Sequence, residues 1–379
     1  MREAYATGGP QCQSIIIVYF VGKQMNRRVE EIETMNKVKW GVIGCGGIAD
    51  RRTIPGMLMS QNAILTAVMD RNGLLAREVA KKYNITHVCE SVEELLTKDI
   101  DAVYIATPVF CHKEQAIAAM RAGKHVLLEK PVGLNVEEAK EIRDVAATER
   151  VKLGVAMMMR FHTYHQAIKD LIEEEKLGDI VSIRMQFSCW YPKIEGSWRQ
   201  NKKLGGGGAL IDLGVHCIDL VRYITAMEVY GITAVCDTLT FDYEVDDSAS
   251  LILKMDNGAH AYVDVNFNIP DDVAQSRLEI YGTKGSIIAD GTLGQEENGT
   301  VKVSLTKEQG YDAMQNRGEI KSYLMEAASG NMYTKEIESF SYAIQNDTVP
   351  AVNIEDGIRV QEIVEAVYQS SETRKFVVL

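Results

Sequence analysis

The sequence lacks the features of several protein classes. Its 379 residues carry a net charge of −12. A chain without excess positive charge cannot neutralise a nucleic-acid backbone, so we expect no nucleic-acid partner. The seven cysteines are scattered and include no C-x-x-C pair. That pattern argues against a disulfide framework and against the common zinc motifs, so we expect no bound metal and a cytoplasmic location.

A membrane-spanning run near the N-terminus is also missing. The apolar stretch at residues 14–22 is far shorter than the roughly 20 residues that cross a bilayer, and no clean signal-peptide cleavage site follows it. We therefore expect no membrane partner. Met35 stands just before the first strand pattern, so we predict that residues 1–34 are a disordered or non-native extension.

Alternating strand and helix patterns begin at residue 38. Apolar runs at residues 38–43, 63–69, 102–106, 125–128 and 152–158 predict strands, and the stretches between them predict helices. This alternation is typical of a doubly wound parallel sheet, the Rossmann type of α/β fold. We predict such a domain over residues 35–157, with its ligands at the carboxyl ends of the strands.

The second half of the chain has a different pattern. One helix is expected at residues 165–175. Strands are expected at residues 180–187, 230–239, 248–255, 259–267 and 277–281, with an Asn-Gly hairpin signal at residues 257–258. Residues 291–333 show no clear pattern and predict a loop excursion, and two helices follow at residues 334–345 and 356–370. We predict an α+β domain with a mostly antiparallel open sheet over residues 158–379, serving substrate binding and oligomerisation, with its last helix packing back on the first domain.

A glycine turn follows the first predicted strand. Gly44 allows a tight turn, Gly46 lets the backbone approach a pyrophosphate, and the small Ala49 keeps the next helix close to the strand. The helix N-terminus offers free N–H groups to the phosphates. Asp70 ends the next strand and is placed to bind the adenine ribose, which favours NAD. Arg71 beside it leaves NADP open, because an arginine there could hold a 2′-phosphate.

Three further residues predict a reacting centre. Lys130 ends a buried strand on the ligand side of the sheet, where an ammonium could stabilise an alkoxide. Asp212 and His216 are four residues apart and would share one helix face. A histidine could accept a hydroxyl proton, and the carboxylate could orient the imidazole or bind substrate. Taken alone, the Asp/His pair could also be a structural contact. The glycines at 205–208 allow close approach to a ligand or to the neighbouring domain.

These motifs together resemble the Gfo/Idh/MocA oxidoreductases. The resemblance runs from about residue 37 to the C-terminus and rests on the glycine turn, on Glu129-Lys130-Pro131 and on GGGALIDLGVHCID at residues 206–219. It implies an NAD(P)-dependent dehydrogenase that moves a hydride between nicotinamide and a secondary alcohol of a sugar, cyclitol or related polyol. It also implies a homodimer or homotetramer, and catalytic roles for Lys130, Asp212 and His216.

The site residues expected on these grounds form two sets. The cofactor set is Gly44, Cys45, Gly46, Gly47, Ile48, Asp70, Arg71, Thr107, Pro108, His112, Glu129 and Lys130. The substrate set is Arg160, Trp198, Arg199, Asp212 and His216. Two alternatives remain for the function. One is a redox-neutral, NAD-dependent glycosidase with the same fold, and the other is a non-catalytic sensor of nucleotide or sugar.

Overall fold

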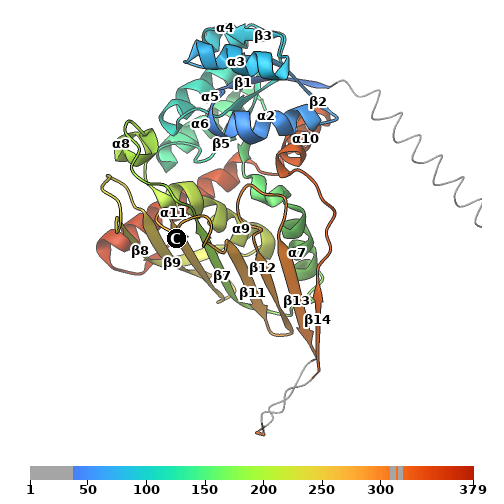
Figure 1. Cartoon of the computed structure of the whole chain (residues 1–379), viewed down its shortest axis with the longest axis vertical. Helices are drawn as coiled ribbons and strands as arrows, with labels where there is room; N and C mark the ends of the chain where they lie inside the picture. Colours follow the sequence, from blue (N-terminus) through green and yellow to red (C-terminus); the bar gives the residue numbers. More distant parts are fainter. Residues whose placement is uncertain (1–36, 308–312, 315–318) are drawn as a thin grey trace, which may run out of the picture.

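The structure is a computed structural model that describes residues 37–307, 313–314 and 319–379. The extension predicted at residues 1–34 lies outside the described residues. Figure 1 shows an α/β domain at one end of the molecule and a broad second sheet at the other, with helices between them.

The first domain is built on a parallel sheet. Within the described residues this sheet has six strands in the order β3-β2-β1-β4-β5-β6. The strands are β1 (Val38–Ile43), β2 (Ala63–Met69), β3 (His87–Cys89), β4 (Ala102–Ile105), β5 (His125–Glu129) and β6 (Leu153–Ala156). The helices are η1 (Ala49–Thr53), α2 (Ile54–Met59), α3 (Gly73–Tyr83), α4 (Val92–Leu96), η2 (Val109–Cys111), α5 (His112–Arg121) and α6 (Val136–Glu149). The predicted Rossmann fold is confirmed, and β3 is a strand that the prediction missed.

The strand order places the site. The chain runs outward from β1 through β2 to β3, and then returns to β4 on the other side of β1. The carboxyl ends of β1 and β4 therefore lie next to each other at a switch point, where open α/β sheets bind their ligands. Asn72, Ser91 and Asn135 accept backbone hydrogen bonds at the starts of α3, α4 and α6, because short polar side chains satisfy the free N–H groups there.

The second domain is built on a larger sheet. Within the described residues its nine strands have the order β14-β13-β12-β11-β7-β10-β9-β8-β15, antiparallel except for the β7–β10 pair. The strands are β7 (Ile180–Ser188), β8 (Val229–Asp237), β9 (Ser248–Met255), β10 (His260–Asn266), β11 (Arg277–Gly282), β12 (Gly285–Asp290), β13 (Thr300–Thr306), β14 (Ile320–Leu324) and β15 (Val377–Val378). The predicted α+β domain is confirmed.

One prediction for this half is wrong. Residues 291–333 were expected to form a loop excursion, but they contain β13, β14 and the start of α10 (Met332–Gln345). Every residue of β14 is exposed. A strand that buries neither face needs no alternation of apolar and polar residues, so the usual sequence signal does not identify it. Residues 308–312 and 315–318 of this segment lie outside the described part.

Helices cover one face of the second sheet and join it to the first domain. They are η3 (Met158–Phe161), α7 (Thr163–Glu173), η4 (Trp198–Gln200), α8 (Lys202–Gly205), η5 (Leu210–Gly214), α9 (Val215–Thr225) and α11 (Ile354–Thr373). The C-terminal α11 contacts the first domain, where its Glu365 accepts a 2.8 Å hydrogen bond from Val136 N at the start of α6. Among the described residues, the segment Lys202–Thr225 passes for a membrane span by length and composition, but its helix is interrupted at residues 206–208 and 83% of its apolar window is buried inside the protein. Burial of this kind is expected of a core helix.

Candidate active site

The glycine turn between β1 and η1 leaves room for a phosphate. Gly44 has φ +91°, and a Cβ there would lie 2.9 Å from the backbone of Ala106, so only glycine fits. A Cβ on Gly47 would meet nothing within 4 Å. Ile48 does not cap the following helix with its side chain. The N–H group of Ala49 donates a 3.1 Å hydrogen bond to Gly46 O within the turn. Burial raises the pKa of the Cys45 thiol to about 12, which makes this residue a small neutral filler.

Asp70 lies at the carboxyl end of β2 and faces this turn. Its carboxylate accepts 2.8 Å hydrogen bonds from Cys45 N and from Asn72 N. The carboxylate therefore fixes the turn as well as offering lone pairs to a ribose diol. Arg71 next to it is exposed. The glycine turn, the uncapped helix and this carboxylate together fit a dinucleotide.

His112 joins the loops that follow β4 and β5. Its Nδ1 lies 2.9 Å from Pro131 O and its Nε2 lies 2.9 Å from Thr107 O. Burial lowers the pKa of His112 to about 4, so the ring is neutral and donates one of these two bonds. The side chain is 1% exposed. It therefore has no surface to offer a cofactor, contrary to its place in the predicted set, and it holds the two strand-end loops together instead.

Lys130 reaches from β5 of the first domain to the second domain. Its Nζ donates a 2.7 Å hydrogen bond to Asp212 Oδ1 and a 2.8 Å hydrogen bond to the carbonyl oxygen of Asp212. The side chains are 13% and 31% exposed, so solvent screens this pair only partly. Burial raises the pKa of Asp212, but the nearby charges of Lys130 and Arg199 outweigh that effect and hold the pKa well below its usual range.

His216 lies one helical turn after Asp212, where η5 passes into α9. The residue is 5% exposed, and its Nδ1 is buried without a hydrogen-bond partner among the described residues. Burial and the Lys130 charge lower the pKa of His216 to about 3. The imidazole is therefore neutral across the physiological range, and its pKa is not near neutrality as the sequence suggested. No hydrogen bond joins Asp212 to His216 in the described part of the chain, so the expected orientation of the imidazole by Asp212 is not seen.

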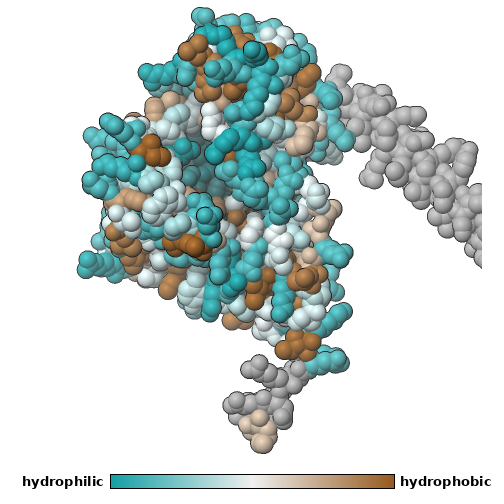
Figure 2. Space-filling model, viewed as in Figure 1, coloured by the Kyte–Doolittle hydropathy of each residue, from teal (hydrophilic) through white to brown (hydrophobic). Residues whose placement is uncertain are grey.

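The substrate residues predicted from sequence separate into two places. Arg199 lies in η4 with its guanidinium 4.3 Å from the Trp198 ring centre and its Nε 3.9 Å from Asp212 Oδ1. Both residues therefore belong to the Lys130–Asp212 site. Figure 2 shows that the surface is hollowed between the first domain and the segment that carries α8, which follows η4.

Arg160 lies elsewhere, buried between η3, α9 and α11. It donates a 2.8 Å hydrogen bond from Nε and a 2.5 Å hydrogen bond from Nη2 to Asp219, and it also pairs with Asp356. With 7% of its surface exposed, Arg160 has its guanidinium already satisfied. The structure gives it a place in the framework instead of the predicted contact with substrate.

Glu129 lies behind Lys130 in a buried polar cluster that sequence analysis missed. Its carboxylate accepts hydrogen bonds from the Tyr104 hydroxyl and from Lys130 N, the latter at 3.2 Å. Burial raises the pKa of Glu129, and burial together with the Glu129 charge raises the pKa of Glu336 on α10 well above its usual value. Among the described residues, Glu336 Oε1 has no partner. No group of three or more possible metal ligands occurs in the described part of the chain, so the expectation of no metal stays a prediction.

The fold is that of a class of two-domain oxidoreductases with an NAD-binding Rossmann domain. A model of the oxidoreductase family with an NAD-binding Rossmann fold matches residues 38–157, and a model of the GFO/IDH/MocA C-terminal domain matches residues 165–288. The chain belongs to the Gfo/Idh/MocA family. The resemblance stated from its motifs is therefore confirmed.

Several relatives are named as sugar dehydrogenases or reductases. A 1,5-anhydro-D-fructose reductase from Ensifer adhaerens is 29% identical over 322 residues, which cover 84% of this chain and 92% of that protein. A D-xylose 1-dehydrogenase (NADP+) from Haloferax volcanii is 28% identical over 337 residues, covering 88% and 97%. Levoglucosan dehydrogenase, solved with NADH and levoglucosan, has a TM-score of 0.80 at 26% identity and covers 90% of this chain and 99% of that chain.

Proposed function

We propose that this protein is an NAD(P)-dependent dehydrogenase or reductase acting on a secondary alcohol of a sugar, cyclitol or related polyol. The contact between Lys130 and Asp212 carries the proposal, because it joins the strand-end face of the nucleotide domain to the helix that bears His216. Substrate would bind between the domains. The relatives that act on sugars with NADH or NADP support the substrate class.

The residues divide the work as follows. Bound NAD(P)+ would take a hydride from the alcohol carbon, giving a ketone and leaving the hydroxyl proton for the protein to remove. Neutral His216 would accept that proton, and the Lys130 ammonium would stabilise the developing alkoxide. Asp212 holds the ammonium through two hydrogen bonds. Trp198 would offer an aromatic face to the sugar ring, and Arg199 would donate to its oxygens.

The cofactor is proposed to be NAD, with NADP as the competing choice. Asp70 supports NAD because its carboxylate would accept from the ribose hydroxyls and repel a 2′-phosphate. Arg71, exposed next to it, is the residue that would favour NADP. Kinetics with both cofactors decide between them.

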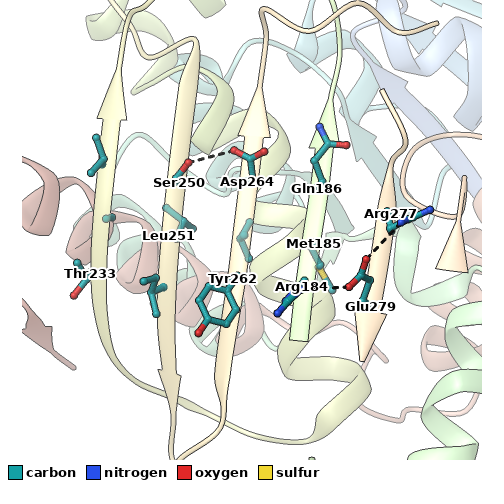
Figure 3. A pocket seen from close by; sticks show the side chains of 14 residues that line it. Arg184, Met185, Gln186, Thr233, Ser250, Leu251, Tyr262, Asp264, Arg277 and Glu279 are labelled. Atoms are coloured by element: carbon teal, nitrogen blue, oxygen red, sulfur yellow. Dashed lines mark hydrogen bonds and ion pairs between the residues drawn. The ribbon is translucent and has the colours of Figure 1, made fainter. Parts of the chain in front are cut away.

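The second sheet supports a homodimer. Alternation along β9 and β10 buries one set of side chains against the helices and leaves Ser250, Ile252, Tyr262 and Asp264 on the other face. Figure 3 shows side chains of this kind standing together on that face of the sheet. Ile252 and Tyr262 are 44% and 40% exposed. We propose that a second copy covers this face, because β-branched and aromatic residues in a row of polar groups suit a self-complementary interface.

A cytoplasmic location is also proposed. The six cysteines in the described part of the chain are all free thiols, which fits a reducing compartment. The experiment that tests the function is reduction of NAD and NADP by purified protein against a panel of sugars, cyclitols and sugar acids. Sugar release without net NADH would point instead to the redox-neutral glycosidase, and tight nucleotide binding without turnover would point to the sensor.

A further inference from the structure

The helix that carries Asp212 and His216 begins without a cap of its own. Its N-cap position is Ala209, whose methyl group cannot accept a hydrogen bond, and the residue before it is Gly208. The first N–H groups of a helix need acceptors when they are buried. At this point Gly208 and Ala209 are both buried.

Asp246, further along the chain, supplies acceptors for three N–H groups at this helix start. Asp246 Oδ1 accepts a 2.9 Å hydrogen bond from Gly208 N, and its Oδ2 accepts a 2.8 Å hydrogen bond from Leu210 N. The carbonyl oxygen of Asp246 accepts a 2.9 Å hydrogen bond from the residue between them, Ala209. Three consecutive backbone N–H groups therefore donate to Asp246, which is 7% exposed.

The C-terminal helix fixes this residue in turn. Tyr368 on α11 donates a 2.7 Å hydrogen bond from its hydroxyl to Asp246 Oδ1. The glycines allow this arrangement. A Cβ on Gly207 would lie 1.9 Å from the Tyr368 hydroxyl oxygen, and a Cβ on Gly208 would lie 1.9 Å from the Asp246 carbonyl oxygen. The glycines at 207 and 208 are thus explained by close packing against Asp246 and Tyr368, not by approach to a ligand.

We infer that Asp246 is a positioning residue for the reaction, acting through the helix start that places Asp212 against Lys130. Asp212 N donates a 3.0 Å hydrogen bond to Gly208 O. The segment at residues 208–210, which Asp246 holds, therefore also positions the first helical turn with Asp212. Both acceptors for Lys130 Nζ belong to Asp212. A displacement of that turn therefore moves both acceptors together, and misplacement of a reacting group by about 1 Å can cost about 100-fold in rate. The inference rests on the proposed function.

The neighbouring residue provides a matched control. Asp247 is also a buried carboxylate, and it accepts backbone hydrogen bonds from Leu239, Thr240 and Phe241 at 2.8 to 2.9 Å. Its Oδ1 also accepts a 3.1 Å hydrogen bond from Asn268 Nδ2, and none of these four donors lies on the helix that carries Asp212 and His216. Asp246→Asn and Asp247→Asn therefore remove the same charge from the same loop. In each variant an amide N–H would face backbone N–H groups, which costs stability in both.

The experiment compares kcat, KM and nucleotide affinity of the two variants at a temperature where both are folded by circular dichroism. We expect Asp246→Asn to lower kcat about 10- to 100-fold with nucleotide affinity unchanged, and Asp247→Asn to retain kcat. In an Asp212→Asn background, Asp246→Asn should lower kcat no further, because the two residues act through one contact. Equal losses in the two single variants, or a lower melting temperature with kcat retained in Asp246→Asn, would overturn the inference.

Two further measurements keep the test decisive. If Asp246→Asn does not fold, Tyr368→Phe replaces it, with an expected severalfold loss of kcat, and an unchanged kcat contradicts the inference. If the wild-type protein turns over no sugar, the proposed function fails. Hydrogen exchange of residues 205–216 then tests Asp246 independently of turnover. Faster exchange in Asp246→Asn but not in Asp247→Asn supports the role of Asp246 in holding the helix start, and equal exchange in the two variants excludes it.

Discussion

Lys130 and Asp212 lie 82 residues apart in the sequence, yet one ammonium group donates to both the carboxylate and the carbonyl oxygen of the same aspartate. This double contact fixes the lysine of the nucleotide domain to the catalytic helix of the second domain. His216 lies one turn further along, where burial and the Lys130 charge lower its pKa to about 3, and we propose this neutral imidazole as the base. The account of function depends on this relationship.

Removal of the lysine should abolish most turnover without unfolding the protein. Lys130→Ala takes away the charge that would stabilise the alkoxide, so we expect kcat to fall about 100- to 1,000-fold. Nucleotide affinity should change little, because we expect the glycine turn and Asp70 to bind the other end of the dinucleotide. Steady-state kinetics and nucleotide titration measure the two effects. Lys81→Ala, on the exposed side of α3, is the control. Retained turnover in Lys130→Ala would remove the lysine from the mechanism.

The decrease of kcat/KM at acid pH should not occur at the usual pKa of a histidine. The pKa of His216 is lowered to about 3 from a usual 6.5, and the base form exists above the pKa. Protonation should therefore inactivate oxidation only near that low value, so kcat/KM should show no inflection at 6.5 that depends on His216. His216→Gln should lower kcat at every pH. An inflection near 6.5 in the wild type that is absent from His216→Gln would show that the free-enzyme imidazole titrates normally.

Cofactor choice should depend on Asp70. Hydrogen bonds to a charged group are worth about 1.5–3 kcal/mol, so Asp70→Ser should lower kcat/KM for NAD about 10- to 100-fold. The same change should raise the preference for NADP, because the repulsion of a 2′-phosphate is removed. The ratio of kcat/KM values for the two cofactors is the measurement. A ratio that stays the same in Asp70→Ser and in the surface variant Asp99→Ser would rule out this role.

The buried Glu336 should make the protein less stable as the pH rises above 4.5. Its pKa in the folded state is raised well above 4.5 by burial and by Glu129, while the unfolded chain titrates near the usual value. Stability is therefore fully present below about pH 4.5 and is lost as the pH rises toward the folded pKa. Glu336→Gln does not titrate, so its melting temperature should exceed that of the wild type by an amount that grows as the pH rises above 4.5 toward the folded pKa. A difference that stays constant over this range would contradict the assignment.

The open sheet face should hold the dimer together. Ile252→Glu places a charge among the exposed residues of β9, so we expect the variant to be monomeric by light scattering while the wild type is dimeric. Val349→Glu, at a residue that is 73% exposed in a loop of the same chain, should leave the assembly intact. A dimer that survives Ile252→Glu would place the interface elsewhere.

The parts of the site that are predictable from sequence are those in which local pattern determines position. Lys130 follows an apolar strand, and parallel strands bring their carboxyl ends to one edge, so its place at the site could be derived. Asp246 could not be found in this way, because three of its partners are backbone N–H groups, which have no sequence signature. The framework role of Arg160 could not be predicted either. Its partner Asp219 is 59 residues away, and only the folded chain shows that the two side chains meet.

The central claim is tested most directly by following the absorbance of reduced nicotinamide while wild type and Lys130→Ala are supplied with NAD or NADP and a panel of sugars, cyclitols and sugar acids. The account predicts cofactor reduction with at least one of these alcohols in the wild type, and its near-complete loss in a Lys130→Ala protein that still binds nucleotide. Nucleotide binding by the wild type without reduction on any alcohol in the panel, or equal rates in the two proteins, would contradict it.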